Sequence, residues 1–212
     1  RTANLLCVFY DKEEGPAQDS GIIAVCEDAD AWLKGVELAI CLEPTDGRIQ
    51  AGCVGGLHAR VIAHGKRAHS ARPWQGENAI YAALPLLTRL RDAVRREVNI
   101  DGLTFYEVIS ATQAATENSR NVIPEQLVLN INYRFAPGKP TDTAIRELRE
   151  FIGSVYTIEI IDESPAGAVC LSEPRLRRWM GAEGLAVEAK QAWTDVARLA
   201  ALGLAAINYG PG

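Results

Sequence analysis

One stretch of the chain, residues 55–162, strongly limits the folds that the chain can adopt, because extended and helical patterns follow one another there in an uncommon order. Residues 57–63 alternate as in a half-exposed strand, and residues 76–98 then carry apolar side chains at helical spacing, with Pro85 expected to bend that helix. The remaining predicted elements are strands at 105–111 and 127–135, a helix at 141–152 and a strand at 156–161. Strand, helix, two strands, helix, strand is the order of a ferredoxin-like split βαβ module.

The segments on either side of this module have the pattern of a parallel α/β sheet. Residues 4–10 and 36–42 are apolar runs with the length and composition of buried strands. The other predicted elements are short helices at 28–33 and 195–202, a helix at 173–183 and strands at 186–189 and 204–208. We therefore predict the α/β class: a partial parallel-sheet domain made of residues 1–53 and 165–212, with a ferredoxin-like α+β domain inserted at 54–164.

Composition narrows the possible functions. The chain has 212 residues and a net charge of −5, which argues against a nucleic-acid partner, since such proteins normally carry a basic face. No apolar run approaches the roughly 18 residues of a membrane span, and we expect neither a membrane partner nor a signal peptide. The five cysteines are odd in number and form no CxxC pair, and Cys7 and Cys41 lie in apolar runs. We expect buried free thiols and a cytoplasmic location.

Acidic residues follow both apolar runs of the split domain. Asp11-Lys12-Glu13-Glu14 comes directly after the first run, and Glu43 directly after the second. One interpretation is a solvated acidic loop, since charge runs are usually surface features. The other is a metal-bound carboxylate beside a general base, because clustered like charges destabilise a fold unless a cation compensates them, and parallel sheets bind ligands at this edge. Two carboxylates alone cannot complete a zinc site.

All three histidines, His58, His64 and His69, fall in the inserted domain. His58 and His64 lie on or just after a predicted strand and are expected to have packing or surface roles. His69 is different, because small residues flank it and Pro73 fixes a turn shortly before a predicted helix. An imidazole held at such a loop tip can present a hydrogen-bond donor to an oxyanion.

These stretches, taken together, resemble the M20 family of dinuclear zinc amidohydrolases and peptidases, and most closely its succinyl-diaminopimelate desuccinylases. Six motifs occur in family order across nearly the whole chain: 11–14 (DKEE), 42–45 (LEPT), 65–73 (GKRAHSARP), 121–124 (NVIP), 132–135 (NYRF) and 193–198 (WTDVAR). The resemblance implies a catalytic domain at 1–53 and 165–212. It also implies that residues 54–164 form a lid through which the protein forms homodimers.

The resemblance implies a role for each matching residue. Glu13 corresponds to the general base, and Glu14 and Glu43 to metal ligands, one for each of two zinc ions. His69 corresponds to a lid histidine that reaches the partner subunit's active site and stabilises the tetrahedral intermediate. The remaining matches, Asn121, Arg134 and Thr194, correspond to residues that bind the substrate.

The sequence also departs from the family pattern. The family's HxD motif and bridging Asp, which precede the Asp-x-Glu-Glu motif, are absent, as is the His that follows the Gly-Pro-Gly turn. We therefore expect an incomplete zinc site, a chain that is inactive as it stands, and a piece of a longer enzyme. The implied reaction is zinc-dependent hydrolysis of an N-acylated amino acid, most closely N-succinyl-LL-2,6-diaminopimelate.

Two alternatives remain open at this stage. One is another M20 activity: acetylornithine deacetylase, aminoacylase or dipeptidase. The other is a non-catalytic dimerisation or binding module built from the lid.

Overall fold

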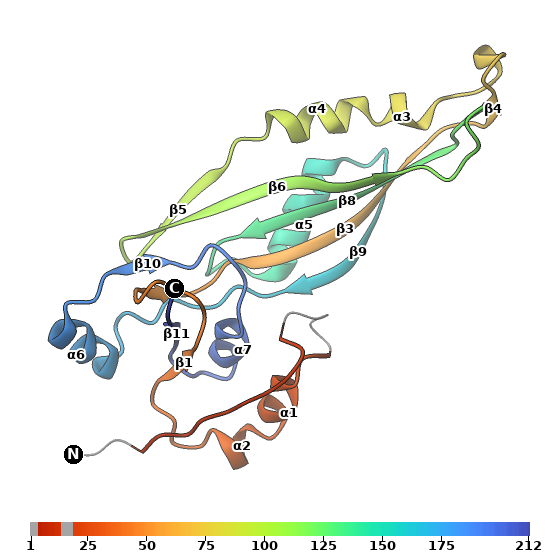
Figure 1. Cartoon of the computed structure of the whole chain (residues 1–212). Coiled ribbons are helices and arrows are strands. Elements are labelled where there is room, and N and C mark those ends of the chain that lie inside the picture. Colours follow the sequence, from red (N-terminus) through yellow and green to blue (C-terminus); the bar gives the residue numbers. More distant parts are fainter. Residues whose placement is uncertain (1–3, 14–18) are drawn as a thin grey trace.

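The computed structural model describes residues 4–13 and 19–212 and consists of an elongated domain attached at one end to a smaller one (Figure 1). We call residues 54–164 the inserted domain, and the described residues before and after it the split domain. The mixed α/β class predicted from the sequence is confirmed.

The inserted domain is built on a five-stranded antiparallel sheet in the order β5-β6-β8-β3-β9. Its strands are β3 (Gly55–His64), β5 (Arg96–Ile100), β6 (Leu103–Ala115), β8 (Gln126–Phe135) and β9 (Thr157–Ser164). Its helices are α3 (Ala79–Ala82), α4 (Leu84–Asp92) and α5 (Thr141–Ile152). At the far end, β4 (Ala68–His69) pairs with β7 (Val122–Ile123) beside the short helix η2 (Pro73–Gln75).

All three helices pack on one face of this sheet. Side chains at alternate positions of β3 and β8 point to that face, and α3, α4 and α5 add residues such as Ala79, Leu86 and Leu148 to one continuous core. The other face is covered by no helix of this domain and carries the polar side chains of the same strands, including Arg134. Alternation along the strands therefore gives the domain a packed face and an open face.

Two predictions for the inserted domain need correction. The helix predicted at 76–98 is two helices, because Pro85 lies in the first turn of α4, which begins at Leu84 and ends at Asp92, rather than bending a longer helix. The last residues of the predicted helix form the edge strand β5, which pairs with β6. Proline lacks the N–H needed inside a helix but is well tolerated in its first turn.

The split domain has a smaller sheet in the order β1-β11-β2-β10. Its strands are β1 (Ala39–Cys41), β2 (Ile49–Ala51), β10 (Val187–Ala189) and β11 (Ala206–Asn208). Its helices are α1 (Ile22–Glu27), α2 (Ala29–Trp32), α6 (Pro174–Glu183) and α7 (Val196–Ala201). The pairs β1–β11 and β2–β10 are parallel, but β11 and β2 run antiparallel, so the sheet is mixed rather than wholly parallel.

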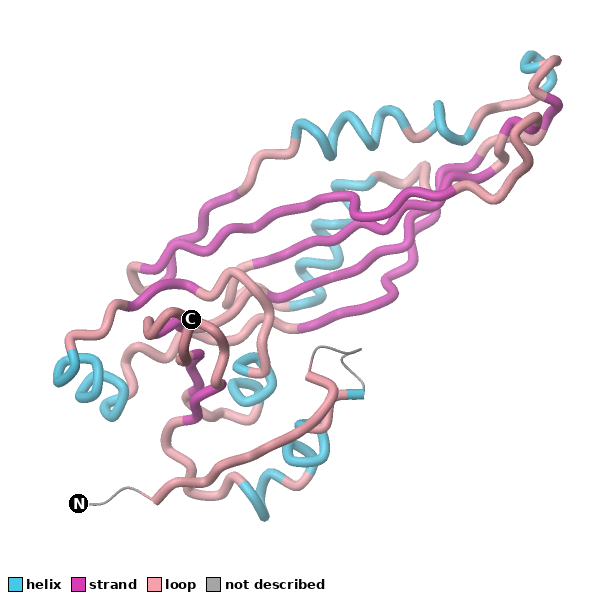
Figure 2. Tube along the Cα trace, viewed as in Figure 1, coloured by secondary structure: helices cyan, strands magenta, loops and turns pink. Residues whose placement is uncertain are grey.

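The apolar run at 4–10 is not a buried strand, which corrects the prediction. Residues 4–10 form no strand and follow an open path along the split domain (Figure 2). Leu5 is 87% exposed and Phe9 92% exposed, and the thiol of Cys7 is exposed as well. Leu42, at the end of the second run, is 82% exposed. Hydrophobicity alone predicted burial, but no described segment covers these side chains.

Candidate functional site

The acidic loop begins immediately after Tyr10. The backbone N–H of Gly21 donates to the carbonyl oxygen of Asp11 at 3.0 Å, which closes the loop between them. Glu13 lies in the described part of this loop and is half-buried. Glu14, the predicted metal ligand, lies outside the described residues, and its role stays a prediction.

Glu43 follows β1, as predicted, and is paired with a lysine. Lys190, which follows β10, places its Nζ 3.2 Å from Oε2 of Glu43, and the Lys190 side chain is only 11% exposed. The loop after Glu43 packs tightly against the turn at Gly210, where a Cβ would lie 2.3 Å from the carbonyl oxygen of Glu43. Thr45 strengthens this contact, because its hydroxyl accepts a hydrogen bond from the Gly210 N–H at 2.9 Å.

Three carboxylates converge around Cys41, the last residue of β1. Burial, together with the negative charges of Asp195, Glu43 and Glu13, raises the pKa of the Cys41 thiol to about 12. A charge acts noticeably on another group only over short distances. The structure therefore brings Glu13 and Glu43 into one region of the split domain.

The described residues do not by themselves fit a zinc ion. Within residues 4–13 and 19–212, no three His, Cys, Asp or Glu side chains gather closely enough to hold a metal. Glu43 also already faces the ammonium of Lys190. A zinc site usually needs three or four protein ligands, so any metal here would need ligands in addition to Glu43.

His69 is not brought to these carboxylates. It is the last residue of β4, at the far tip of the inserted domain, whereas Glu43 follows β1 at the opposite end of the molecule (Figure 1). The His69 ring is exposed, and its Nδ1 accepts a hydrogen bond from the Ala71 N–H at 3.1 Å. A neutral ring bonded in this way carries its proton on Nε2, where it can donate outward.

Asn121 lies at the same tip as His69. Its carbonyl oxygen accepts a hydrogen bond from the Ser70 N–H at 2.8 Å, and the next residue, Val122, pairs with His69 across the two-stranded sheet. The structure therefore places Asn121 with His69 and away from Glu13 and Glu43.

Arg134 lies on the open face of the five-stranded sheet. Its neighbour across the ladder is Gly56, and a Cβ on that glycine would lie 2.6 Å from Nη1 of Arg134. The absence of a side chain at Gly56 leaves the room that the guanidinium occupies beside β3. A planar fork of donors held on an open face suits a carboxylate ligand.

Thr194 is placed close to the carboxylates but is only 1% exposed. Its hydroxyl is buried without a hydrogen-bond partner among the described residues, and its carbonyl oxygen accepts the Cys53 thiol at 3.6 Å. Its predicted substrate contact stays a prediction.

Two residues of this region were not singled out from the sequence: Asp195 and Lys190. Asp195 is 2% exposed and accepts a hydrogen bond from the Tyr10 hydroxyl at 2.7 Å. Asp195 belongs to the same 193–198 motif as Thr194, and an acidic residue three positions before Arg198 is a usual signal of an ion pair on a helix. That spacing could have identified Asp195, but nothing in the sequence marked Lys190.

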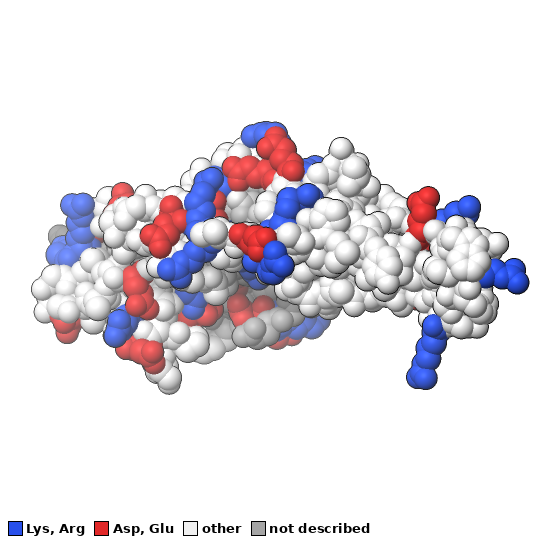
Figure 3. Space-filling model, turned by 90° about the horizontal axis from the view of Figure 1, so that it is seen from above, with Lys and Arg blue, Asp and Glu red and all other residues white. Residues whose placement is uncertain are grey.

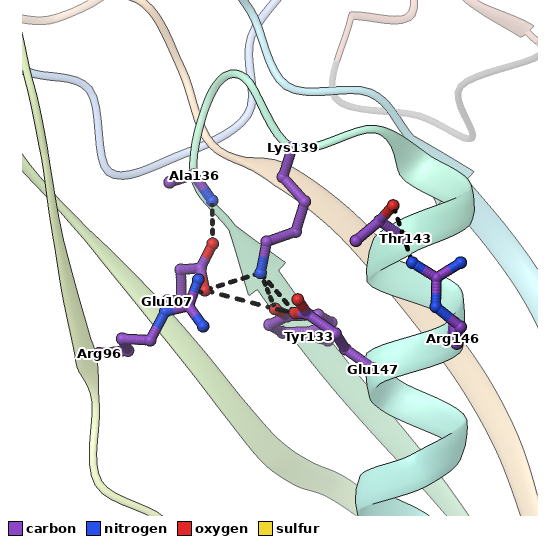
Figure 4. Close-up of polar contacts among 8 residues, drawn as sticks. All are labelled: Arg96, Glu107, Tyr133, Ala136, Lys139, Thr143, Arg146 and Glu147. Carbon is purple, nitrogen blue, oxygen red and sulfur yellow. Dashed lines mark hydrogen bonds and ion pairs between the residues drawn. The ribbon is translucent and has the colours of Figure 1, made fainter.

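A second buried polar cluster lies in the inserted domain, around Glu107 (Figure 4). The Glu107 side chain is 4% exposed and contacts Lys139 Nζ at 2.9 Å and Arg96 Nε at 3.1 Å, and it accepts the Ala136 N–H at 3.0 Å. Lys139 also pairs with Glu147, which accepts the Tyr133 hydroxyl at 2.8 Å. Each carboxylate in this cluster faces at least one cation.

The surface carries both signs of charge. On the face seen in Figure 3, acidic and basic side chains are interspersed, and an uncharged stretch separates the wider part of the molecule from the tip. Exposed apolar side chains of α3 and α4 include Ile80, Tyr81 (69% exposed) and Leu84. Within the described ranges, every helix is too short or too polar to cross a bilayer.

Known proteins resemble this chain over its whole length. A Mycobacterium tuberculosis protein provisionally named succinyl-diaminopimelate desuccinylase is 42% identical over 212 residues, which are 100% of this chain and 60% of that protein. A Corynebacterium glutamicum protein named succinyl-diaminopimelate desuccinylase is 36% identical and is matched over 58% of its length by 99% of this chain. The chain thus spans about 60% of the curated relatives that it matches.

Solved structures share the fold at low identity. A tripeptidase from Staphylococcus aureus superposes with a TM-score of 0.64 at 14% identity, over 90% of this chain and 54% of the tripeptidase. An aminobenzoyl-glutamate utilization protein from Klebsiella pneumoniae gives 0.60 at 18% identity, over 95% of this chain and 56% of that protein. A family model of the peptidase dimerisation domain of M20 enzymes matches residues 52–158, which include nearly all of the inserted domain. The chain therefore belongs to the M20 peptidase family and carries that family's dimerisation domain.

Proposed function

We propose that this chain serves in the zinc-dependent hydrolysis of the amide bond of N-succinyl-LL-2,6-diaminopimelate, which yields succinate and LL-diaminopimelate. The substrate follows from the names of the relatives that match the whole chain. The structural observation that supports the proposal is the convergence of Glu13 and Glu43 on the region around Cys41.

In this proposal the carboxylates have separate roles. Glu13 is the general base, since a carboxylate next to a bound water can take a proton from it. Glu14 and Glu43 are two of the ligands of the family's zinc pair. Because the described residues do not complete such a site, we expect the 212-residue chain to be inactive by itself.

The substrate carries several carboxylates, and we assign one of them to Arg134. Its guanidinium lies on the open sheet face, where an anion can reach it from outside. Asn121 and Thr194 are assigned as further substrate-binding residues. Arg134→Lys keeps the charge but loses the fork of donors, so we expect both Arg134→Lys and Arg134→Ala to raise KM.

The test of the hydrolase proposal uses the full-length gene product. Hydrolysis of succinylated and acetylated amino acids is measured, since preference for the acetyl group would favour another M20 activity. Glu13→Gln is expected to lower kcat by at least about 100-fold, the range in which general bases act. Glu150→Gln, an exposed residue of α5, is the control and should keep wild-type turnover. Normal turnover in Glu13→Gln would show that the base is misassigned.

We also propose that two copies associate through the inserted domain. The strand β5 pairs with β6 only as far as Glu107, so residues 108–115 of β6 have no strand partner on that side among the described residues. These eight residues carry no charge, and an uncharged open edge is a template for another strand. The exposed side chains of Ile80, Tyr81 and Leu84 on α3 and α4 supply apolar surface on the same domain.

Sedimentation tests this association. Wild type is expected to sediment as a dimer, and Tyr81→Asp combined with Leu84→Asp as a monomer. Val155→Asp, at a position that is 79% exposed beyond α5, is the control and should remain dimeric. A monomeric wild type would exclude the proposal.

A homodimer would also give His69 a role. Since His69 lies far from Glu43 in its own chain, we propose that it acts in the partner subunit's site. An inactive His69→Ala protein mixed with inactive Glu13→Gln protein should then recover part of the activity after subunits exchange. Absence of recovery in demonstrated heterodimers would contradict this role.

The alternative from a different class is a non-catalytic dimerisation or binding module. The family match to the dimerisation domain and the lack of a metal cluster among the described residues favour it. Tight self-association of a full-length product that hydrolyses none of the substrates would support this alternative.

All five cysteines are free, as in a reducing compartment, and we include a cytoplasmic location in the proposal.

A further inference from the structure

The carboxylate of Asp195 links two parts of the split domain that are far apart in the sequence. Its Oδ2 accepts the Tyr10 hydroxyl at 2.7 Å, and its Oδ1 lies 2.9 Å from Nε of Arg198. The Asp195 side chain is only 3% exposed. A buried carboxylate is costly unless donors surround it, so the partners of Asp195 are essential to its placement.

Asp195 gives up the usual role of an aspartate at its position. It is the N-cap residue of α7, where an Asp side chain normally accepts a hydrogen bond from an N–H of the first helical turn. Here the side chain makes no such bond and faces Tyr10 and Arg198 instead. The carboxylate therefore makes no cap hydrogen bond to α7, and of its two partners Arg198 belongs to α7 and Tyr10 lies outside the helix.

Tyr10 is the residue through which the acidic loop is attached. The residues before it, such as Leu5 and Phe9, are exposed and form no strand, so they cannot fix its position. Asp11 follows directly, and its bond to Gly21 closes the loop that contains Glu13. Burial and the bond to Asp195 both raise the pKa of Tyr10, so its hydroxyl keeps its proton and its donor role up to strongly alkaline pH.

We infer that Asp195 is a positioning residue that fixes the loop carrying Glu13 by holding the hydroxyl of Tyr10. The inference deepens the proposed function and rests on it for the role of Glu13. Asp195 does not touch the reacting atoms; it acts through Tyr10 and the Asp11–Gly21 closure. Loss of this contact should let the loop move while the rest of the fold persists.

The first experiment does not depend on activity. Hydrogen exchange of the Gly21 amide is measured in the 212-residue chain, because this N–H is protected by the bond to Asp11. We expect at least tenfold faster exchange in Tyr10→Phe and in Asp195→Asn. Tyr133→Phe is the matched control, since it removes another tyrosine–carboxylate bond, to Glu147, in the inserted domain. Wild-type exchange of Gly21 in Tyr10→Phe would overturn the inference, even if Asp195→Asn fails to fold.

The second experiment uses the full-length gene product. Tyr10→Phe is expected to lower kcat by tenfold or more and to change KM by less than threefold, because the base is displaced while the carboxylate-binding residues stay in place. Tyr133→Phe should keep kcat within twofold of wild type. Equal loss of kcat in both variants would indicate general destabilisation and contradict a positioning role. If wild type hydrolyses no substrate, the proposed function fails, and the Gly21 exchange still decides whether Asp195 fixes the loop.

Discussion

Both domains contain a tyrosine bonded to a carboxylate, but the two bonds differ in what surrounds them. In the inserted domain, Tyr133 and Glu147 are 14 residues apart, on a strand and the next helix, and Lys139 contacts both. In the split domain, Tyr10 and Asp195 are 185 residues apart, and Tyr10 belongs to a segment that forms no strand. The Tyr133–Glu147 bond is one of several contacts between residues close in the sequence. The Tyr10–Asp195 bond joins two segments that are far apart in the sequence.

The two domains also differ in what holds them together. The inserted domain has one core that joins a five-stranded sheet to its helices, and its buried charges are paired within it. The split domain has strands of three residues and leaves side chains such as Leu5 and Leu42 exposed. The inserted domain therefore has a large core of its own, whereas the split domain has smaller buried clusters, and the segment that carries Glu13 is attached to them by the long-range Tyr10–Asp195 bond.

The largest expected effect is removal of the central carboxylate of the inserted domain. Glu107→Ala removes one of the two carboxylates that pair with the ammonium of Lys139, whose side chain is only 9% exposed. We expect the free energy of unfolding to fall by about 3–5 kcal/mol. Urea unfolding followed by circular dichroism measures the loss. Glu159→Ala breaks the exposed pair with Arg60 and should cost at most about 1 kcal/mol. Similar losses in both variants would mean that burial of the cluster is unimportant.

Replacing a leucine by alanine should lower the free energy of unfolding strongly in the inserted domain and hardly at all in the segment 4–10. Leu148→Ala removes a fully buried side chain from the inserted-domain core and should cost about 2–5 kcal/mol. Leu5→Ala changes a side chain that is 87% exposed and should stay within about 0.5 kcal/mol of wild type. The change in unfolding free energy of each variant is measured from the midpoint of its urea unfolding curve. A large loss in Leu5→Ala would show that residues 4–10 are packed in solution.

Alkaline pH should weaken the split domain before the inserted domain. All cysteines lie outside residues 54–164, and burial raises the pKa of Cys41 to about 12 from its ordinary value near 9. A group whose pKa is raised by folding stabilises the fold fully below its unfolded pKa, and this contribution falls as pH rises from about 9 towards 12. The loss is at most about 1.4 kcal/mol per pH unit for each such thiol.

Tryptophan fluorescence during urea unfolding at pH 8 and pH 10 can follow this loss, since Trp179 and Trp193 both lie in the split domain. Cys41→Ala should make the pH dependence shallower, and Cys7→Ala, at an exposed position, should leave it unchanged. If the unfolding free energy of Cys41→Ala depends on pH as steeply as that of wild type, the Cys41 thiol does not cause the dependence.

The smallest expected effect concerns the connection between the domains. The Gln191 amide accepts the Tyr106 N–H at 3.1 Å and donates to the Thr104 carbonyl oxygen at 2.8 Å, which joins the end of β10 to β6. Gln191→Ala should cost about 1 kcal/mol, because the two bonds are exposed to water. Exchange of the Tyr106 amide should become faster, whereas Gln126→Ala, at an exposed position, should not affect it. Unchanged exchange would mean that the bridge does not hold the domains.

Sequence reasoning succeeded where one periodic pattern decides both structure and burial. The predicted helix at 141–152 and the strand at 127–135 match α5 and β8 closely, because their apolar side chains repeat with a clear period and meet a core in the same domain. The roles of Glu13 and Glu43 stay predictions, since the apolar run before Glu43 contains the strand β1 but the run before Glu13 forms no strand.

The errors arose where structure depends on what lies across from a segment. Residues 4–10 are as apolar as a buried strand, but a sequence cannot say whether anything covers them. The first three residues of β5, 96–98, were assigned to a helix because they follow a helical pattern without a clear break. The spacing of Asp195 to Arg198 is visible in the sequence, but its contact with Tyr10, 185 residues earlier, is not, because no local pattern reports such a contact.

The open edge of β6 has a consequence for how the protein must be handled. Residues 108–115 offer unpaired backbone groups and no charged side chain to repel an incoming strand. Such a segment can add any extended chain, including one from a partly unfolded neighbour. If a second copy covers this edge, association protects the protein from aggregation. Variants that cannot associate would then aggregate more readily than wild type, even though each domain still folds.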